Sequence, residues 1–339
     1  MALLATVRRP ERPGEASLAL KAHTREVLFC DLIVKRRAQH APFPEMSKLV
    51  ALWKRAADQK LPPKLFDKGE ASCIINEVRI DEARQIVTIL LSVADKRAPD
   101  QTYGNHVKRS SRTVAKEADE GNEHSAHLVI SLTHRPNYPE TYACLVERVP
   151  TLSIPRVQSM LNDVVKRYCE IDPSLFSFNA VSGAKAKVQN FIPNIILAGN
   201  PSAAFQRDIE EGRINGLRLI KSMPKQSLGS GNYLELSDLE VKVNVSKLIP
   251  PGQRWATILQ AVQTQKATYS RAKMYLAPAG SDSAASFEFD TDTGAIIGEA
   301  YVRRQSISNI DPVLRSATDK IVDHLAMKMV ALLEKERTG

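Results

Sequence analysis

The pattern closest to a catalytic site is the alternation of Asp238, Glu240 and Lys242 with apolar residues, as in a β-strand. Side chains two residues apart on a strand project from the same face. Metal-dependent nucleases of the restriction type use a carboxylate and a lysine placed in this way to hold a cation and orient water. They also need an acid on a preceding strand, where this chain offers Arg218 and Lys221. A solvated strand face is the alternative, and we expect no catalytic residue, metal or cofactor.

The remaining reactive side chains form no recognisable motif. His124 and His127 would point to opposite faces of a strand, so we expect no shared metal, and His127 between apolar neighbours is typical of a core histidine. The four cysteines, Cys30, Cys73, Cys144 and Cys169, are widely spaced and contain no Cys-x-x-Cys pair, which argues against zinc or redox chemistry. The first three lie in apolar runs and are expected to be buried thiols, which fits a reducing cytoplasm.

The chain is basic, with a formal net charge of +9, and its composition is that of an ordinary globular protein. Residues 212–281 contain ten basic and three acidic residues, a net charge of +7, and no acid follows Glu240 within that span. Such segregation favours a surface that tracks phosphates, because each neutralised phosphate releases counterions. An unused basic surface is the alternative. The predicted nucleic-acid-binding residues here are Arg218, Lys221, Lys242, Lys247, Arg254, Lys266, Arg271 and Lys273.

Residues 94–125 form a long charged insertion between two apolar segments that predict buried strands, Ile86 to Val93 and Ala126 to Leu132. Lys108, Arg109 and Arg112 lie in its basic half, which ends at Lys116, and the seven residues after Lys116 contain four acids. We predict a loop that contacts a polyanion, ranked second to the downstream segment, in which the acidic half competes with phosphate for the bases. A solvated insertion is the alternative.

Apolar periodicity predicts an α+β fold in which antiparallel sheets pack against amphipathic helices in two domains. A flexible basic arm (residues 1–16) precedes an N-terminal α+β domain (17–175) with a four-stranded meander. A basic C-terminal α+β domain (176–339) follows and closes with a long helix that we expect to begin at Asp311 and Pro312. We expect the stretch 171–202 to be irregular, Trp255 to be a core residue, and a strand from Ala295 to Arg303.

From about Val27 onward, the order of elements resembles the RexA-type phage-exclusion proteins. The resemblance lies in the charged insertion before His127-Leu128-Val129-Ile130, in the segment 145–152 leading into a helix, in the strand Leu239 to Val243, and in the long helix after the 290–294 turn. It implies a dimeric α+β protein that binds DNA without sequence preference, senses phage DNA and signals to an effector. No single residue role is carried over by it.

Taken together, these observations predict a cytoplasmic protein that binds duplex DNA without sequence preference and acts in anti-phage defence, as a homo-oligomer with a possible protein effector. A metal-dependent nuclease and a basic assembly protein that meets an acidic partner are the alternatives. No stretch approaches the roughly 20 apolar residues of a membrane-spanning helix.

Overall fold

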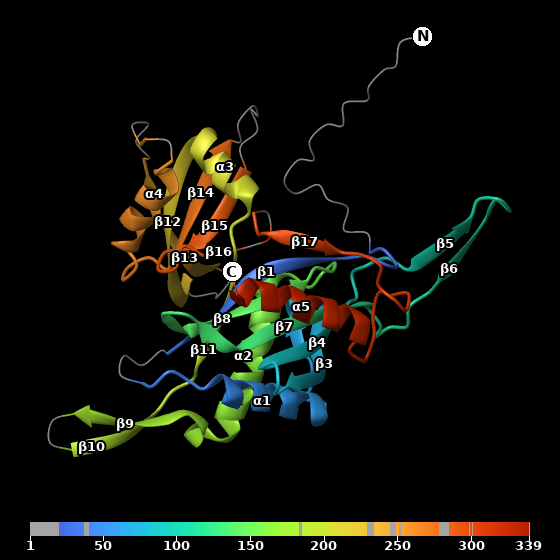
Figure 1. Ribbon diagram of the computed structural model, residues 1–339, viewed down its shortest axis with the longest axis horizontal. Helices are drawn as coiled ribbons and strands as arrows, with labels where there is room; N and C mark the ends of the chain where they lie inside the picture. The colour runs from blue at the N-terminus through green and yellow to red at the C-terminus, as the bar shows by residue number, and fades with distance from the viewer. Residues whose placement is uncertain are drawn as a thin grey trace, which may run out of the picture.

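The computed structural model describes residues 20–36, 41–182, 185–228, 234–244, 249–250, 252–277, 285–297, 299 and 301–338. Within them, one antiparallel sheet of 13 strands runs in the order β13-β12-β14-β15-β16-β11-β1-β8-β7-β4-β3-β2, with β17 beside β1 (Figure 1). Two hairpins, β5–β6 and β9–β10, stand apart from it. This architecture confirms the α+β class.

The strands are β1 (Arg25–Lys35), β2 (Lys64–Phe66), β3 (Ala71–Asp81), β4 (Ile86–Asp95), β5 (Gln101–Asn105), β6 (Ser110–Val114), β7 (Asn122–Arg135), β8 (Tyr138–Glu147), β9 (Ser177–Ser182), β10 (Lys185–Asn190), β11 (Asn194–Gly199), β12 (Arg213–Leu228), β13 (Leu234–Val243), β14 (Arg271–Ala277), β15 (Ala285–Asp290), β16 (Ile296–Ile297) and β17 (Arg304–Ile307). The helices are α1 (Met46–Asp58), α2 (Ile154–Ile171), α3 (Ala203–Glu211), α4 (Arg254–Gln263) and α5 (Asp323–Thr338), with short 3-10 turns at Asp67–Gly69 and Pro173–Phe176.

The central strands are buried on both faces. Along β1, Leu28 and Leu32 belong to the core that α1 and α2 cover, whereas Val27 and Phe29 pack in the core beneath α5. Strands covered on both faces carry continuous apolar runs instead of an alternating pattern. This explains why the apolar runs in β1, β4 and β7 were recognisable from the sequence. The predicted meander β3-β4-β7-β8 is confirmed.

The second half of the sheet carries α3 and α4 on one face and an aromatic cluster beneath them. Phe205 and Trp255 meet edge to face at 5.1 Å between ring centroids, so Trp255, expected in the core, is partly buried and packs against it. The two halves of the sheet, β13 to β16 and β11 to β2 in the sheet order, are joined where Gly199 of β11 pairs with Ile296 of β16. A Cβ on Gly199 would lie 2.2 Å from a methyl group of Val302, so only glycine fits this crossing without a shift.

The expected division into two domains is not confirmed. β11 pairs with β1 and α5 packs on β7 and β8, so elements from beyond residue 175 complete the N-terminal core. One continuous core cluster also includes residues from both halves, from Leu28 to Phe289. The arm at residues 1–16 lies outside the described residues.

Three expectations about local structure are wrong. The stretch 171–202 is not irregular, since it contains β9, β10 and β11. Within the described part of the expected strand 295–303, only Ile296–Ile297 is a strand. The last helix begins at Asp323 and not at Asp311, because residues 308–322 form a strap that donates backbone N–H groups to the sheet; Ile321, for example, donates to Glu77 Oε2 at 2.7 Å.

Candidate nucleic-acid interface

Several predicted basic residues of the C-terminal half lie on one face of four neighbouring strands. β13, β12, β14 and β15 pair antiparallel, and their registers place Lys242, Arg218, Lys273 and Glu288 in one row. Arg271, two residues before Lys273 on β14, shares this face. The opposite face packs in the core with α3 and α4. The fold therefore gathers these bases on the outer face of the sheet.

Acidic side chains share this outer face and pair with the bases. Arg218 Nη1 lies 2.7 Å from Glu240 Oε2, and this hydrogen bond raises the pKa of Arg218. Arg271 bridges two acids, at 3.1 Å from Asp238 Oδ1 and 3.0 Å from Glu288 Oε2. The face consequently has mixed charge.

Two further predicted bases also meet carboxylates. Lys273 Nζ is 3.7 Å from Glu288, and Lys266 Nζ is 2.7 Å from Asp292. The hydrogen bond between Lys266 and Asp292 raises the pKa of the lysine and lowers that of the carboxyl group. Glu288 and Asp292 both follow the +7 segment in sequence. The charge segregation seen along the chain is therefore reduced in space, and a phosphate would have to displace these carboxylates.

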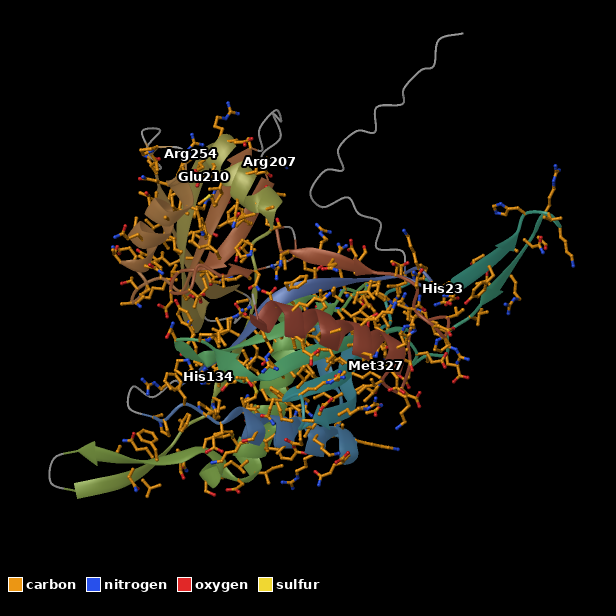
Figure 2. All side chains as sticks on the ribbon, in the orientation of Figure 1. His23, His134, Arg207, Glu210, Arg254 and Met327 are labelled. Atoms are coloured by element: carbon orange, nitrogen blue, oxygen red, sulfur yellow. The ribbon has the colours of Figure 1, made fainter. Side chains whose placement is uncertain are left out.

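The other predicted residues of this segment have different environments. Arg254 opens α4, and its Nη1 donates to the carbonyl oxygen of Gly212 at 2.9 Å, which ties the guanidinium to the protein itself. Figure 2 shows Arg254 beside Glu210 of α3, at the edge of this half of the molecule. Lys221 and Lys242 are exposed on β12 and β13. Lys247 lies outside the described residues.

The nuclease arrangement is present only in part. Asp238, Glu240 and Lys242 do share one face of β13, but Glu240 is paired with Arg218 of β12 and Asp238 with Arg271 of β14. In the described part of the chain, no three or more His, Cys, Asp or Glu side chains are grouped so that they could hold a metal ion. His124 and His127 lie on opposite faces of β7. No observation favours metal-dependent cleavage.

The charged insertion, predicted as a loop, forms a hairpin that projects from the body of the molecule (Figure 1). β5 and β6 pair over five residues each, and every residue of both strands is exposed. In the turn, Asn105 Oδ1 accepts from the N–H of Lys108 at 3.0 Å, and Arg109 has a φ of 46°. The hairpin escaped prediction because neither strand has an apolar face. Its foot borders the body, and its tip is remote from the core.

The hairpin surface is basic and lacks compensating acids. No acidic residue occurs from Gln101 to Lys116. Lys108 and Arg109 lie at the tip, and the Arg112 guanidinium lies over the ring of Tyr103, 5.1 Å from its centroid. Within the described ranges, none of these three bases forms an ion pair. Like the exposed Lys221 and Lys242, they keep their charge free for a ligand, and the three of them lie together on one projecting hairpin.

The acidic half of the insertion lies at the foot of this hairpin. Glu120 accepts from the backbone N–H of Glu117 at 2.9 Å, and Asp119 lies 3.3 Å from Lys96 Nζ. These acids therefore do not compete for the bases at the tip. Two uncharged residues of the hairpin, Tyr103 and the 96% exposed Val107 at the tip, could not be predicted as contacts, because nothing in their spacing distinguishes them.

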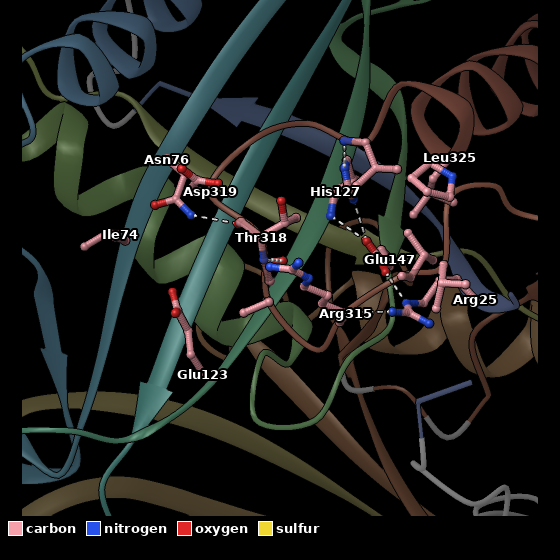
Figure 3. A pocket seen from close by; sticks show the side chains of 16 residues that line it. Arg25, Ile74, Asn76, Glu123, His127, Glu147, Arg315, Thr318, Asp319 and Leu325 are labelled. Atoms are coloured by element: carbon pink, nitrogen blue, oxygen red, sulfur yellow. Dashed lines mark hydrogen bonds and ion pairs between the residues drawn. The ribbon is translucent and has the colours of Figure 1, made fainter. Parts of the chain in front are cut away.

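A buried polar network lies elsewhere in the sheet. Glu147, 2% exposed, accepts from Arg25 Nε at 2.8 Å and from both the backbone N–H (2.9 Å) and Nδ1 (2.7 Å) of His127 (Figure 3). His127 Nε2 accepts the N–H of Val322 at 3.0 Å, which assigns the ring proton to Nδ1. His127 is thus a satisfied core histidine, as predicted.

The strap at residues 308–322 closes over this network and leaves a cavity of about 540 Å³. Arg25 Nη2 donates to the carbonyl oxygen of Arg315 at 2.9 Å, and Asn76 Nδ2 donates to that of Thr318 at 3.3 Å. The side chains of Arg25 and Asn76 donate hydrogen bonds to backbone carbonyl oxygens of the strap. The network therefore anchors the strap and offers no nucleophile. Its members, Arg25 and Glu147, are 122 residues apart, and no sequence pattern connects them.

No protein-family model and no curated protein matches this chain. Any functional assignment therefore depends on the geometry above. In the described residues, no helix is long and apolar enough to span a membrane.

Proposed function

We propose that the chain binds duplex DNA without sequence preference and that the β5–β6 hairpin is its principal contact. The observation that carries this proposal is the projecting, fully exposed ribbon, whose three basic side chains pair with no carboxylate among the described residues. A two-stranded ribbon has the width that the major groove admits, and proteins also use such ribbons in the minor groove. Lysine and arginine on it would contact phosphates, which supply affinity without reading sequence.

The tip of the hairpin supports contact with a groove. Val107 is exposed between His106 and Lys108, and Arg112 stacks on Tyr103 one strand away. Proteins that bind and bend duplex DNA often place an apolar side chain between base steps, while neighbouring lysine and arginine side chains contact the phosphates. The outer face of β12 to β15 adds Lys242 as a secondary contact in this proposal, whereas Lys221 lies on the opposite face of β12, beside Leu239 of β13.

The proposal is tested first on the wild-type chain, by fluorescence anisotropy with several unrelated duplexes across a range of salt concentrations. We expect equal affinities for the duplexes and a log–log salt slope of about −3 to −4, since each phosphate contact contributes about −0.9 and the proposal has three contacts on the hairpin and one at Lys242. Affinities that differ between sequences would contradict nonspecific binding. No binding at low salt would remove the proposal.

The wider expectations extend this proposal. A sensor role in anti-phage defence, a protein effector and a cytoplasmic location are carried by the resemblance in element order and by the four cysteines, all of which are buried free thiols. An acidic protein partner would use the same hairpin. Capture of such a partner together with no retention of DNA would favour that assembly role over DNA binding.

A further inference from the structure

The two edge strands of the 13-stranded sheet, β2 and β13, differ in length and in how far they are protected from pairing with another chain. β2 is three residues long, and its Lys64 is held by Asp163 at 2.9 Å. Short edge strands and edge lysines prevent pairing with other chains. β13, at the other end, is ten residues long and pairs only with β12. Along β13, the backbone groups that point away from β12 face no other strand of the described sheet.

The apolar face of the sheet is also exposed to solvent along β13. Leu217 and Leu219 of β12 are buried, and the register places Val241 of β13 directly beside Leu219. Val241 is nevertheless 39% exposed, and Leu239 is 50% exposed. The core of this half of the molecule therefore continues to the outer edge of β13, where no other part of the described chain covers it.

We propose that β13 pairs antiparallel with β13 of a second copy of this chain, around a two-fold axis at Val241. In this register, Val241 faces the partner's Val241 and Leu239 faces the partner's Val243. On the other side of the sheet, Glu240 faces the partner's Lys242, and the symmetry repeats that pair. An isologous interface must be self-complementary in this way.

Neighbouring registers are disfavoured by charge. An axis at Leu239 would place Asp238 opposite the partner's Glu240, and an axis at Glu240 or Lys242 would place that charge opposite its own copy. Like charges directly opposite each other destabilise a strand pair, whereas opposite charges stabilise it. Of the axes from residue 238 to residue 242, only Val241 pairs opposite charges and no like ones.

This pairing would extend both faces of the sheet across the axis. The exposed apolar side chains would abut, and all the outward-facing backbone groups of residues 239–243 would gain partners. The proposal is independent of the hairpin and of DNA binding. It replaces the general expectation of a homo-oligomer with a specific surface, register and symmetry.

The test uses the full chain with Val241→Lys and Val241→Glu, each alone and mixed in equal amounts. Analytical ultracentrifugation over a range of concentrations should show a wild-type dimer that dissociates on dilution. Each variant alone should raise the dimer dissociation constant about 100-fold or more, because like charges then meet at the axis. The mixture should dimerise again, because Lys faces Glu only in the mixed dimer.

The matched control is Leu65→Lys on β2, an apolar side chain that is 62% exposed on the opposite edge strand, and it should remain a dimer. Position 241 is already exposed, and circular dichroism checks that each variant is folded. A wild-type chain that is monomeric at every concentration would overturn the proposal, as would a Val241→Lys dimer as stable as the wild type. A mixture that stays monomeric would overturn the axis at Val241.

Discussion

Charge reversal of Lys108, Arg109 and Arg112 to glutamate is expected to weaken binding to duplex DNA by about 10³-fold at about 50 mM salt. Each phosphate contact contributes roughly one log unit at that salt concentration, because its counterions are released into a dilute solution. The three side chains project on a fully exposed ribbon and form no ion pair with any part of the chain that the structure describes. The log–log salt slope of any remaining binding should become shallower by about 3, which leaves a slope of about −1 from the secondary contact at Lys242. Fluorescence anisotropy with one duplex measures both quantities.

The matched control carries the same change of charge on the body of the molecule, through Lys48→Glu, Lys60→Glu and Lys166→Glu. These three lysines are exposed and do not belong to the hairpin. Their substitution should reduce affinity only through the net charge, by about tenfold or less. An equal loss in both triple variants would show that net charge and not the hairpin governs binding. Unchanged affinity of the hairpin variant would place the DNA contact elsewhere.

Removal of the Glu147 carboxylate by Glu147→Ala is expected to reduce the free energy of unfolding by about 3–5 kcal/mol. The substitution leaves the Arg25 guanidinium buried and uncompensated, and it removes the acceptor for both N–H groups of His127. The strap should also loosen, because the same two residues hold the backbone of Arg315 and Val322. Urea unfolding followed by circular dichroism measures the change.

Two further variants separate the charge from the hydrogen bonds and from surface effects. Glu147→Gln keeps an acceptor in the same place and should cost less than the alanine variant. Asp58→Ala removes an exposed ion pair with Lys54 on α1, 3.1 Å in length, and should change stability by no more than about 0.5 kcal/mol. A Glu147→Ala protein as stable as the wild type would show that the network does not anchor the fold. Hydrogen exchange at residues 308–322 would report on the strap itself.

The sequence by itself determined the α+β class, the long buried strands and most of the helices. Runs such as Ile86 to Val93 and the apolar stripe of α2 are local signals, since their burial depends on neighbours within one element. The same local logic identified His127 as a core histidine. It failed at β5 and β6, where both strand faces are exposed and no apolar alternation exists.

The tertiary structure alone decided which charges are free. Lys266, Arg271 and Lys273 meet acids that the register of β13 to β15 and the turn after β15 bring beside them, although the sequence separates several of these partners from the basic segment. Lys108 and Arg109, for which the following acids were expected to compete with phosphate, lie at the tip of a projecting hairpin and pair with no acid in the described part of the chain. The physical reason is that charges interact across a few ångströms of space, and strand register sets those distances independently of separation along the chain.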